Sequence, residues 1–200
     1  MIGDSPQKPH SDPPFLRAIQ LETQKRGFTM PADMQVGSLL RTLVASRPGG
    51  RFLELGTGLG LSLSWIVAGM DKGASVISVE NERIYSAFTA ELFARDDRVT
   101  IVNTDGEHWL RSYRGPPFDL IFADTWPGKY NHLDEALELV KAGGMYVVDD
   151  MIPQDNWPAG HLERATALLE DLHAREEFYL TSLAWSTGVV IMVRRSDDVR

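Results

Sequence analysis

Short apolar runs alternate along the chain with longer stretches in which apolar residues recur every three or four positions. The short runs predict strands at residues 51–55, 74–80, 99–103, 118–123 and 145–148, with two more in the tail at 178–185 and 189–194. The longer stretches predict helices at residues 61–70, 82–95, 107–113, 131–140 and 158–175. This alternation predicts an α/β fold with a doubly wound, Rossmann-like sheet of seven strands. The sheet is expected to be mostly parallel, with an antiparallel C-terminal hairpin and helices on both faces.

Two more helices are predicted ahead of the first strand, at residues 13–26 and 33–46. Asp12 is placed to cap the first of them and Gly27 to end it, and Asn131 is placed to cap a later helix. Because these two helices lie outside the alternating core, their role is open. Helices in this position cover a cofactor, build a homodimer contact or simply pack on the sheet.

The first strand runs into a glycine turn, and a helix begins directly after it at Leu61–Ser62. Glycines let a backbone approach a ligand closely, and the free N–H groups of the helix start face the same place. Such a turn usually holds a nucleotide-like cofactor, although an ordinary tight connection is the alternative. The spacing is G-x-G-x-G, and Leu61 stands where a dinucleotide fingerprint has its third glycine. No G-K-[ST] follows, which excludes a P-loop.

Acidic residues stand at the ends of the second to fifth predicted strands. They are Glu80, Asp105, Asp124, Asp149 and Asp150. Ligands of open α/β sheets bind at the carboxyl ends of the strands, so this series points to a binding edge. Glu80 is placed to accept hydrogen bonds from both hydroxyls of a ribose. Capping of the next helix or simple solvation is the alternative for each acid taken alone.

Composition limits the classes of function. The 200 residues suit one domain, expected at residues 15–200, behind a polar, proline-rich arm at residues 1–14 that we expect to be disordered. The net charge of −8 argues against nucleic acid as a partner. The chain has no cysteine, which excludes disulfides and thiolate chemistry. No apolar run approaches the roughly 20 residues of a membrane helix, and we expect a cytoplasmic protein without a membrane partner.

The pattern E-x-G-x-G-x-G at residues 54–60 resembles motif I of the class I methyltransferases, which bind S-adenosylmethionine (SAM). The resemblance implies that Glu54 helps to hold the methionine ammonium, Ser62 the carboxylate end and Asp105 the adenine amine. The full set of cofactor-binding residues that it implies is Glu54, Gly56, Thr57, Gly58, Gly60, Ser62, Glu80, Asp105, Gly106 and Asp124.

The second half of the chain is similar to the metal-dependent O-methyltransferases related to catechol O-methyltransferase. Two segments carry this resemblance, residues 118–130 and 147–150. It implies that Asp124, Asp149 and Asp150 hold one divalent ion, Mg²⁺ or Ca²⁺, which would bind two vicinal oxygens of the substrate. Asp150 departs from the family, which usually has Asn there. Adjacent side chains on a strand point to opposite faces, so these two acids can share an ion only if the chain turns at this point.

The position of the family's catalytic lysine is occupied by Pro127, which cannot accept a proton. Lys129, two residues later, is our candidate for a catalytic group together with Asp124. His132 and His161 are the other candidates for a base.

The resulting hypothesis is a SAM-dependent methyltransferase that acts on an oxygen of a small molecule. Trp126 and Trp157 flank the expected acceptor side, where they would stack on a planar substrate or pack a lid. The alternative is a protein that binds SAM or its demethylated product, S-adenosylhomocysteine (SAH), as a sensor or partner module without catalysis. An NAD-dependent oxidoreductase is disfavoured by Leu61, and a nucleic-acid methyltransferase by the charge and by the lack of a target-base motif.

Overall fold

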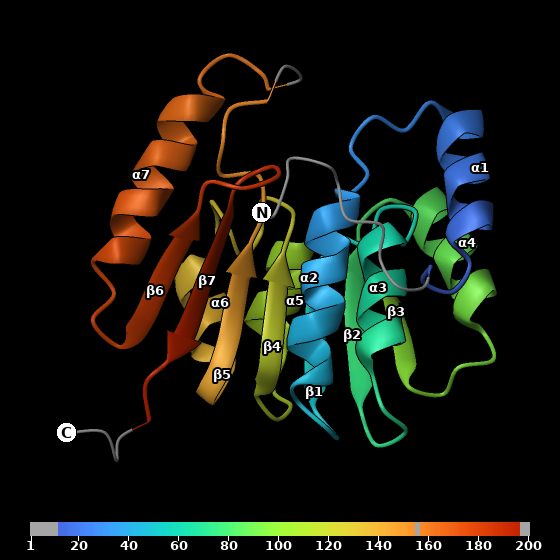
Figure 1. The fold of residues 1–200 in the computed structure, drawn as a ribbon, viewed down its shortest axis with the longest axis horizontal. Helices are drawn as coiled ribbons and strands as arrows, with labels where there is room; N and C mark the ends of the chain where they lie inside the picture. The colour runs from blue at the N-terminus through green and yellow to red at the C-terminus, as the bar shows by residue number, and fades with distance from the viewer. Residues whose placement is uncertain (1–11, 155–156, 197–200) are drawn as a thin grey trace, which may run out of the picture.

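The computed structural model describes residues 12–154 and 157–196, so most of the expected N-terminal arm at residues 1–14 lies outside the described residues. Seven strands form one sheet in the order β3-β2-β1-β4-β5-β7-β6 (Figure 1). The strands β1 to β5 are parallel to one another, whereas β7 lies antiparallel between β5 and β6. Their bounds are β1 Arg51–Leu55, β2 Ser75–Glu80, β3 Val99–Asn103, β4 Phe118–Ala123, β5 Val140–Val148, β6 Phe178–Leu183 and β7 Val189–Arg194.

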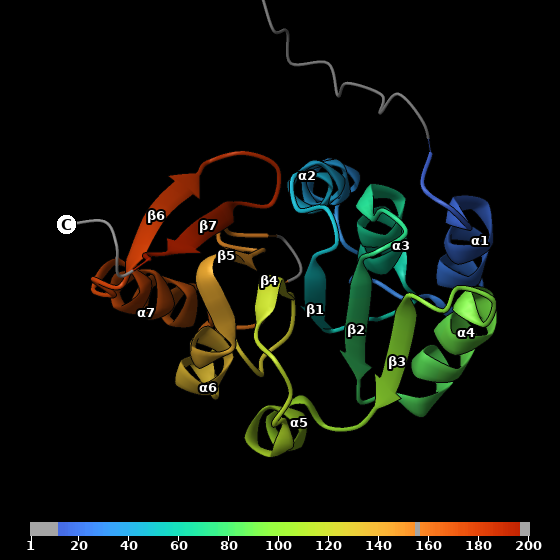
Figure 2. The ribbon, with the colours of Figure 1, turned by 90° about the horizontal axis from the view of Figure 1, so that it is seen from below.

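Helices cover both faces of the sheet, and Figure 2 shows α2 and α3 on one side and α5 and α6 on the other. Among the described residues, no helix combines the length and the apolar character needed to cross a membrane. The bounds are α1 Leu16–Arg26, α2 Met34–Ala45, α3 Leu61–Gly69, α4 Arg83–Phe93, α5 Gly106–Ser112, α6 Leu133–Glu138 and α7 His161–His173. The predicted α/β, mostly parallel architecture with an antiparallel C-terminal pair is confirmed.

An apolar core lies on each face of the sheet, between the strands and the helices that cover that face. Successive side chains along a strand point alternately into one core and the other. Phe52 and Phe122 point toward α2 and α3, where they pack with residues such as Leu40. Their neighbours Leu53 and Ile121 point the other way, into a core shared with α5, α6 and α7. Because β1 and β4 are buried on both faces, they read in the sequence as nearly continuous apolar runs.

Several element ends differ from the prediction. Asp12 does not cap the first helix: α1 begins at Leu16, preceded by Phe15 in a left-handed conformation without a side-chain cap. The ring of Phe15 instead packs edge-on against Phe93, at 5.2 Å between centroids, so a tertiary contact replaces the local one. Asn131 does not cap α6 either, because the helix starts two residues later, after His132. The structure also begins β5 at Val140, five residues before its predicted start.

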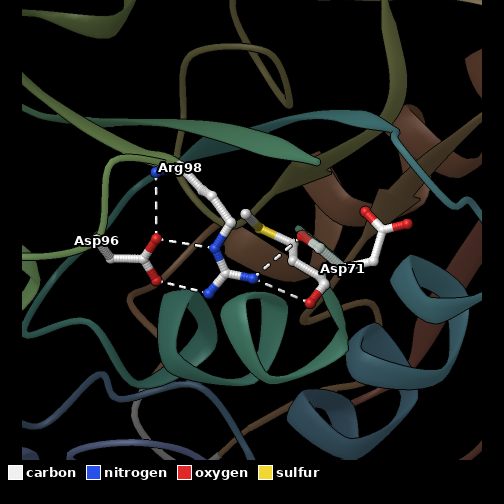
Figure 3. A network of polar contacts seen from close by, with 4 residues as sticks. Asp71, Asp96 and Arg98 are labelled. Atoms are coloured by element: carbon white, nitrogen blue, oxygen red, sulfur yellow. Dashed lines mark hydrogen bonds and ion pairs between the residues drawn. The ribbon is translucent and has the colours of Figure 1, made fainter. Parts of the chain in front are cut away.

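Arg98, just before β3, ties the strand to the end of α3 (Figure 3). Its guanidinium binds both carboxylate oxygens of Asp96, at 2.8 and 2.6 Å, and donates to the carbonyls of Met70 and Asp71. These carbonyls lie just past the last residue of α3, and the carbonyl of Asp71 also accepts from the Ala74 N–H at 3.4 Å. Hydrogen bonding to Arg98 is also the main reason why the pKa of Asp96 is lowered.

We expect Arg98→Met to lower the free energy of unfolding by about 1–2 kcal/mol, because it removes a bidentate charge-assisted pair and two carbonyl partners. Urea denaturation at pH 7 measures the change. Arg83→Met, at an exposed position on α4, is the control and should stay close to the parent chain. Equal stability of the two variants would show that the Arg98 network contributes nothing.

Candidate functional site

A cavity of about 310 Å³ opens at the carboxyl ends of β1, β2 and β3, where the sheet was expected to bind a ligand. Four of the predicted cofactor residues line it: Gly56, Glu80, Asp105 and Gly106. The remaining lining residues are Leu55, Val79, Asn81, Thr104, Glu107, Thr125, Trp126, Pro127 and Asn131. Another hollow, of about 360 Å³, lies between α4 and β3, but none of the predicted site residues line it. The strand-end cavity is therefore the candidate site.

The glycine turn requires glycine at its first position for two reasons. Gly56 has a φ of 96°, which side-chain-bearing residues rarely adopt, and a Cβ there would lie 2.9 Å from the backbone oxygen of Asp124. At Gly58 a Cβ would lie 3.2 Å from the ring of Phe28. Phe28 belongs to the connection between α1 and α2, so this N-terminal segment packs against the glycine turn.

Glu80 fixes the turn from the end of β2. One carboxylate oxygen accepts from the backbone N–H of Gly58 at 2.8 Å, and the other accepts from Glu82 at 2.8 Å. The side chain is buried yet lines the cavity. Because each carboxylate oxygen has a second lone pair, Glu80 can still accept hydrogen bonds from ligand hydroxyls.

Asp105 and Gly106 form the far side of the cavity. Asp105 caps α5 by accepting from the backbone N–H of His108 at 2.9 Å, so part of its role is to stabilise the start of this helix. A Cβ on Gly106 would lie 2.8 Å from the Cβ of Pro127. Pro127 thus packs against the start of α5 and lines the cavity wall, which gives this departure from the family pattern a structural function.

Glu54 lies under the glycine turn and is completely buried. Ser78 on the neighbouring strand donates to its Oε2, and Ser78 and Thr57 share a hydrogen bond of 2.5 Å. Within the part of the chain that the structure describes, Oε1 of Glu54 has no hydrogen-bond partner. Burial raises the pKa of Glu54 to about 7, against the opposing effect of the Ser62 and Ser78 hydroxyls. A buried carboxylate with a free oxygen is suited to a cationic ligand group.

Without a ligand, Glu54 should make stability depend on pH. Its pKa is about 7 in the folded chain and 4.5 in the unfolded one, so the folded chain binds more protons between these values. Stability is therefore lost as the pH rises from about 4.5 to 7. We expect Glu54→Gln to be more stable than the parent chain at pH 8, by on the order of 2 kcal/mol, and equal to it near pH 4.5. Thermal unfolding of the parent chain and of Glu54→Gln across this pH range tests the prediction, and Glu138→Gln, at an exposed position, is the control. A stability difference between Glu54→Gln and the parent chain that does not change with pH would contradict it.

The acids after β4 and β5 gather at the other half of the same edge. The strand β5 ends at Val148 and Asp150 has a φ of 55°, so the chain does turn at this point. Asp149 is 2% exposed, and its Oδ1 accepts from the Thr187 hydroxyl and from the Asp150 N–H. Burial, with repulsion from neighbouring carboxylates, raises the pKa of Asp149 to about 6 and that of Asp124 well above its usual range.

Lys129 lies among these acids. The turn after β4 directs its side chain inward, leaving it 4% exposed, and its Nζ donates to the backbone oxygen of Asp149 at 2.6 Å. Burial lowers the pKa of Lys129, and the carboxylates of Asp124, Asp150 and Asp149 oppose this shift. The structure therefore brings together all four residues that were predicted for catalysis and metal binding.

This arrangement does not fit a divalent ion. Within residues 12–154 and 157–196, no three His, Cys, Asp or Glu side chains form a group that could hold a metal ion. Oδ1 of Asp149 already accepts from Thr187 and Asp150, and the buried ammonium of Lys129 places a positive charge beside the acids, where it would repel a second cation. The expected Mg²⁺ or Ca²⁺ site is therefore not supported. The sequence did not reveal this because it does not show that Lys129 points inward.

Aromatic residues border the acids. Tyr130 shares a hydrogen bond of 3.1 Å with His161, whose ring lies 4.4 Å from that of Trp157. Trp126 is 44% exposed, and the guanidinium of Arg164 lies over its ring at 4.9 Å. These rings could contact a planar ligand.

The predicted bases are separated by the fold, and two contributors were missed. His161 lies beside Tyr130, whereas His132 binds Glu135 at 2.6 Å at the start of α6. Tyr130 could have been noted from its place in the segment after β4. Thr187 sits in the hairpin turn before β7, and nothing in the sequence there signals its bond to Asp149.

Comparison with known proteins shows which proteins this chain is similar to. Residues 53–151 match the family described as a methyltransferase domain. A catechol O-methyltransferase of Mycobacterium tuberculosis is 27% identical over 158 residues, covering 76% of this chain and 68% of that protein. A Mycobacterium avium protein with an O-methyltransferase name is 28% identical over 127 residues, which is 61% of this chain. The match spans only 56% of the length of that relative.

The fold agrees with these relationships. The crystal structure of a Bacillus cereus O-methyltransferase in complex with SAH matches with a TM-score of 0.79 and 21% identity, over 90% of each chain. At this identity the likeness is one of fold. Residues 53–151 therefore resemble a methyltransferase domain, and the relatives of the chain include O-methyltransferases, among them a catechol O-methyltransferase.

Proposed function

We propose that this chain is a SAM-dependent methyltransferase that methylates an oxygen of a small molecule. The observation that carries the proposal is the strand-end cavity, in which the carboxylate of Glu80 is held against the glycine turn by Gly58. The relative from M. tuberculosis is a catechol O-methyltransferase by name, and the B. cereus structure contains SAH. These findings support the same chemistry here.

The residues around the cavity fit the parts of SAM. Glu80 would bind the ribose hydroxyls, and Asp105 and Gly106 would meet the adenine. The Oε1 atom of Glu54 would take the methionine ammonium, and the Ser62 hydroxyl, at the start of α3, lies close enough to act on the same carboxylate. Thr57, Gly58 and Gly60 complete the turn. When bound, SAM supplies an electrophilic methyl group on its sulfonium. The chain itself has to align an acceptor oxygen with that methyl, an effect worth up to about 7–11 kcal/mol.

The acceptor would bind beside the acids of the second half of the edge. Asp124 is proposed to take the proton of the acceptor hydroxyl, and Lys129 to contact the same oxygen. Trp126 and Trp157 favour a planar acceptor such as a phenol.

Two measurements test the proposal. Isothermal titration with SAM and with SAH should give one site per chain; absence of binding at millimolar ligand would end the proposal. Transfer of a labelled methyl group to a set of phenols and carboxylic acids then tests catalysis. Binding of both ligands without transfer to any acceptor would favour a sensor that binds SAM or SAH.

A further inference from the structure

A buried lysine stands where the relatives' pattern would lead one to look for a metal ion. Lys129 is 4% exposed and is surrounded by carboxylates from two different strand ends, Asp124 after β4 and Asp149 and Asp150 after β5. A charged side chain is seldom buried this deeply unless it has partners.

The turn after β4 is built to hold Lys129 in this place. The carbonyl of Trp126 accepts from the N–H groups of Lys129, Tyr130 and Asn131, at 3.0, 2.8 and 3.1 Å. Gly128 has a φ of 84°, and a Cβ there would lie 2.4 Å from the side chain of Leu55. The carbonyl of Gly128 also accepts from the buried Tyr146 hydroxyl. The turn is thus fastened from several sides, and these contacts hold the backbone of Lys129 in the position from which its side chain is buried.

The surroundings of Nζ suit an ammonium group. One N–H donates to the carbonyl of Asp149 at 2.6 Å, and the ring of Tyr130 lies 5.3 Å away, within cation–π range. An ammonium has three donors, so two remain for another acceptor. Among the described residues, no carboxylate forms a direct ion pair with Nζ, and the three acids act on it through space. On the α7 side, His161 and Arg164 are the nearby basic groups.

We propose that the Lys129 ammonium replaces the divalent ion at this site and binds the acceptor through a single oxygen. A metal ion can chelate two vicinal oxygens, whereas an ammonium donates to one oxygen at a time. The site should therefore accept a molecule with one hydroxyl on a planar ring as well as one with two adjacent hydroxyls. The part concerning the acceptor rests on the proposed function, whereas the absence of metal binding does not.

The metal part is tested by titrating Mn²⁺ into the protein with SAH present and following free Mn²⁺ by electron paramagnetic resonance. We expect no uptake up to about 1 mM Mn²⁺, because Lys129 opposes a second cation. Uptake of one Mn²⁺ per chain that disappears in Asp149→Asn would overturn the proposal. This measurement needs neither a known acceptor nor turnover.

The acceptor part is tested by binding 4-nitrophenol and 4-nitrocatechol to the SAH complex in the presence of EDTA. We expect the two affinities to agree within about threefold, and Lys129→Met to weaken both by about 10- to 100-fold, the effect of losing one charge-assisted hydrogen bond. Lys129→Arg keeps the charge and should recover part of the loss. Lys141→Met, at an exposed lysine that pairs with Asp119, is the matched control and should bind like the parent chain.

Three outcomes count against the acceptor part. The first is unchanged binding in Lys129→Met. The second is binding of 4-nitrocatechol alone, and only when Mg²⁺ replaces EDTA. The third is failure of both phenols to bind. SAH affinity and the circular dichroism spectrum of each variant show whether the fold is intact. A chain that binds no SAH at all would instead overturn the proposed function, so the two failures are distinguishable.

Discussion

Gly56→Ala should abolish measurable SAM and SAH binding and lower the free energy of unfolding by about 2–4 kcal/mol. The φ of 96° at this position already strains a residue with a side chain. The new methyl group would also lie 2.9 Å from the carbonyl oxygen of Asp124 and 3.0 Å from the Cβ of Thr125. Since Asp124 is held to β1 through Leu55, neither side can move without disturbing the edge of the cavity.

Gly143→Ala separates the two causes. Gly143 has a φ of 72°, but a Cβ there would have no neighbour within 4 Å among the described residues. This control should therefore show the backbone strain alone, about 1–2 kcal/mol, and leave SAH binding unchanged. Urea denaturation and isothermal titration of both variants give the comparison. If Gly56→Ala were no worse than Gly143→Ala, the close approach of the two strand ends would not matter.

The arrangement of the sheet was predictable because it depends on short-range patterns. Apolar runs located the strands, and helical spacing located the helices between them. Helix and strand ends were less predictable, since they were decided by distant contacts. The start of α1 is an example, because Phe15 packs on Phe93, which is 78 residues away in the chain by their numbers.

Part of the lining of the strand-end cavity could be predicted, because strand ends position side chains directly. Glu80, Asp105 and Gly106 line the cavity as expected from the carboxyl ends of parallel strands. The acceptor half depends on a loop instead. No pattern in the sequence shows that Gly128 turns Lys129 inward, or that Thr187 reaches Asp149 from a hairpin 38 residues away.

The two halves of the edge therefore differ in how closely they follow the family. The half with the cavity has the glycine turn and the strand-end acids Glu80 and Asp105 of the family pattern. Glu80 binds the N–H of Gly58, and Asp105 caps α5. In the acceptor half, Pro127 packs against Gly106 and leaves Lys129 to supply the positive charge. The loop after β4 thus contributes both to the wall of the strand-end cavity, through Pro127, and to the surroundings of the buried acids, through Lys129.

Glu80→Gln should weaken SAH binding by about 100-fold, the largest loss that we expect from a change of one functional group in the cavity. The carboxylate accepts from the N–H groups of Gly58 and Glu82, and a carboxamide has only one oxygen to offer them. One N–H is left facing another donor, and the charge that would strengthen bonds to the ribose hydroxyls is lost. Charge-assisted hydrogen bonds contribute about 1.5–3 kcal/mol each, and 1.4 kcal/mol corresponds to tenfold in affinity.

Glu82→Gln provides the matched control, because Glu82 is exposed and its side chain makes no cap hydrogen bond to α4. It carries the same change in charge two residues away, so it accounts for any general electrostatic effect on SAH. Isothermal titration at two salt concentrations should show Glu82→Gln binding within about twofold of the parent chain, since exposed charges are screened. Equal losses in both variants would mean that net charge, rather than the bonds from Glu80 to the glycine turn, determines cofactor affinity. If only Glu80→Gln loses affinity for SAH, the Glu80 carboxylate both positions Gly58 and binds the ribose.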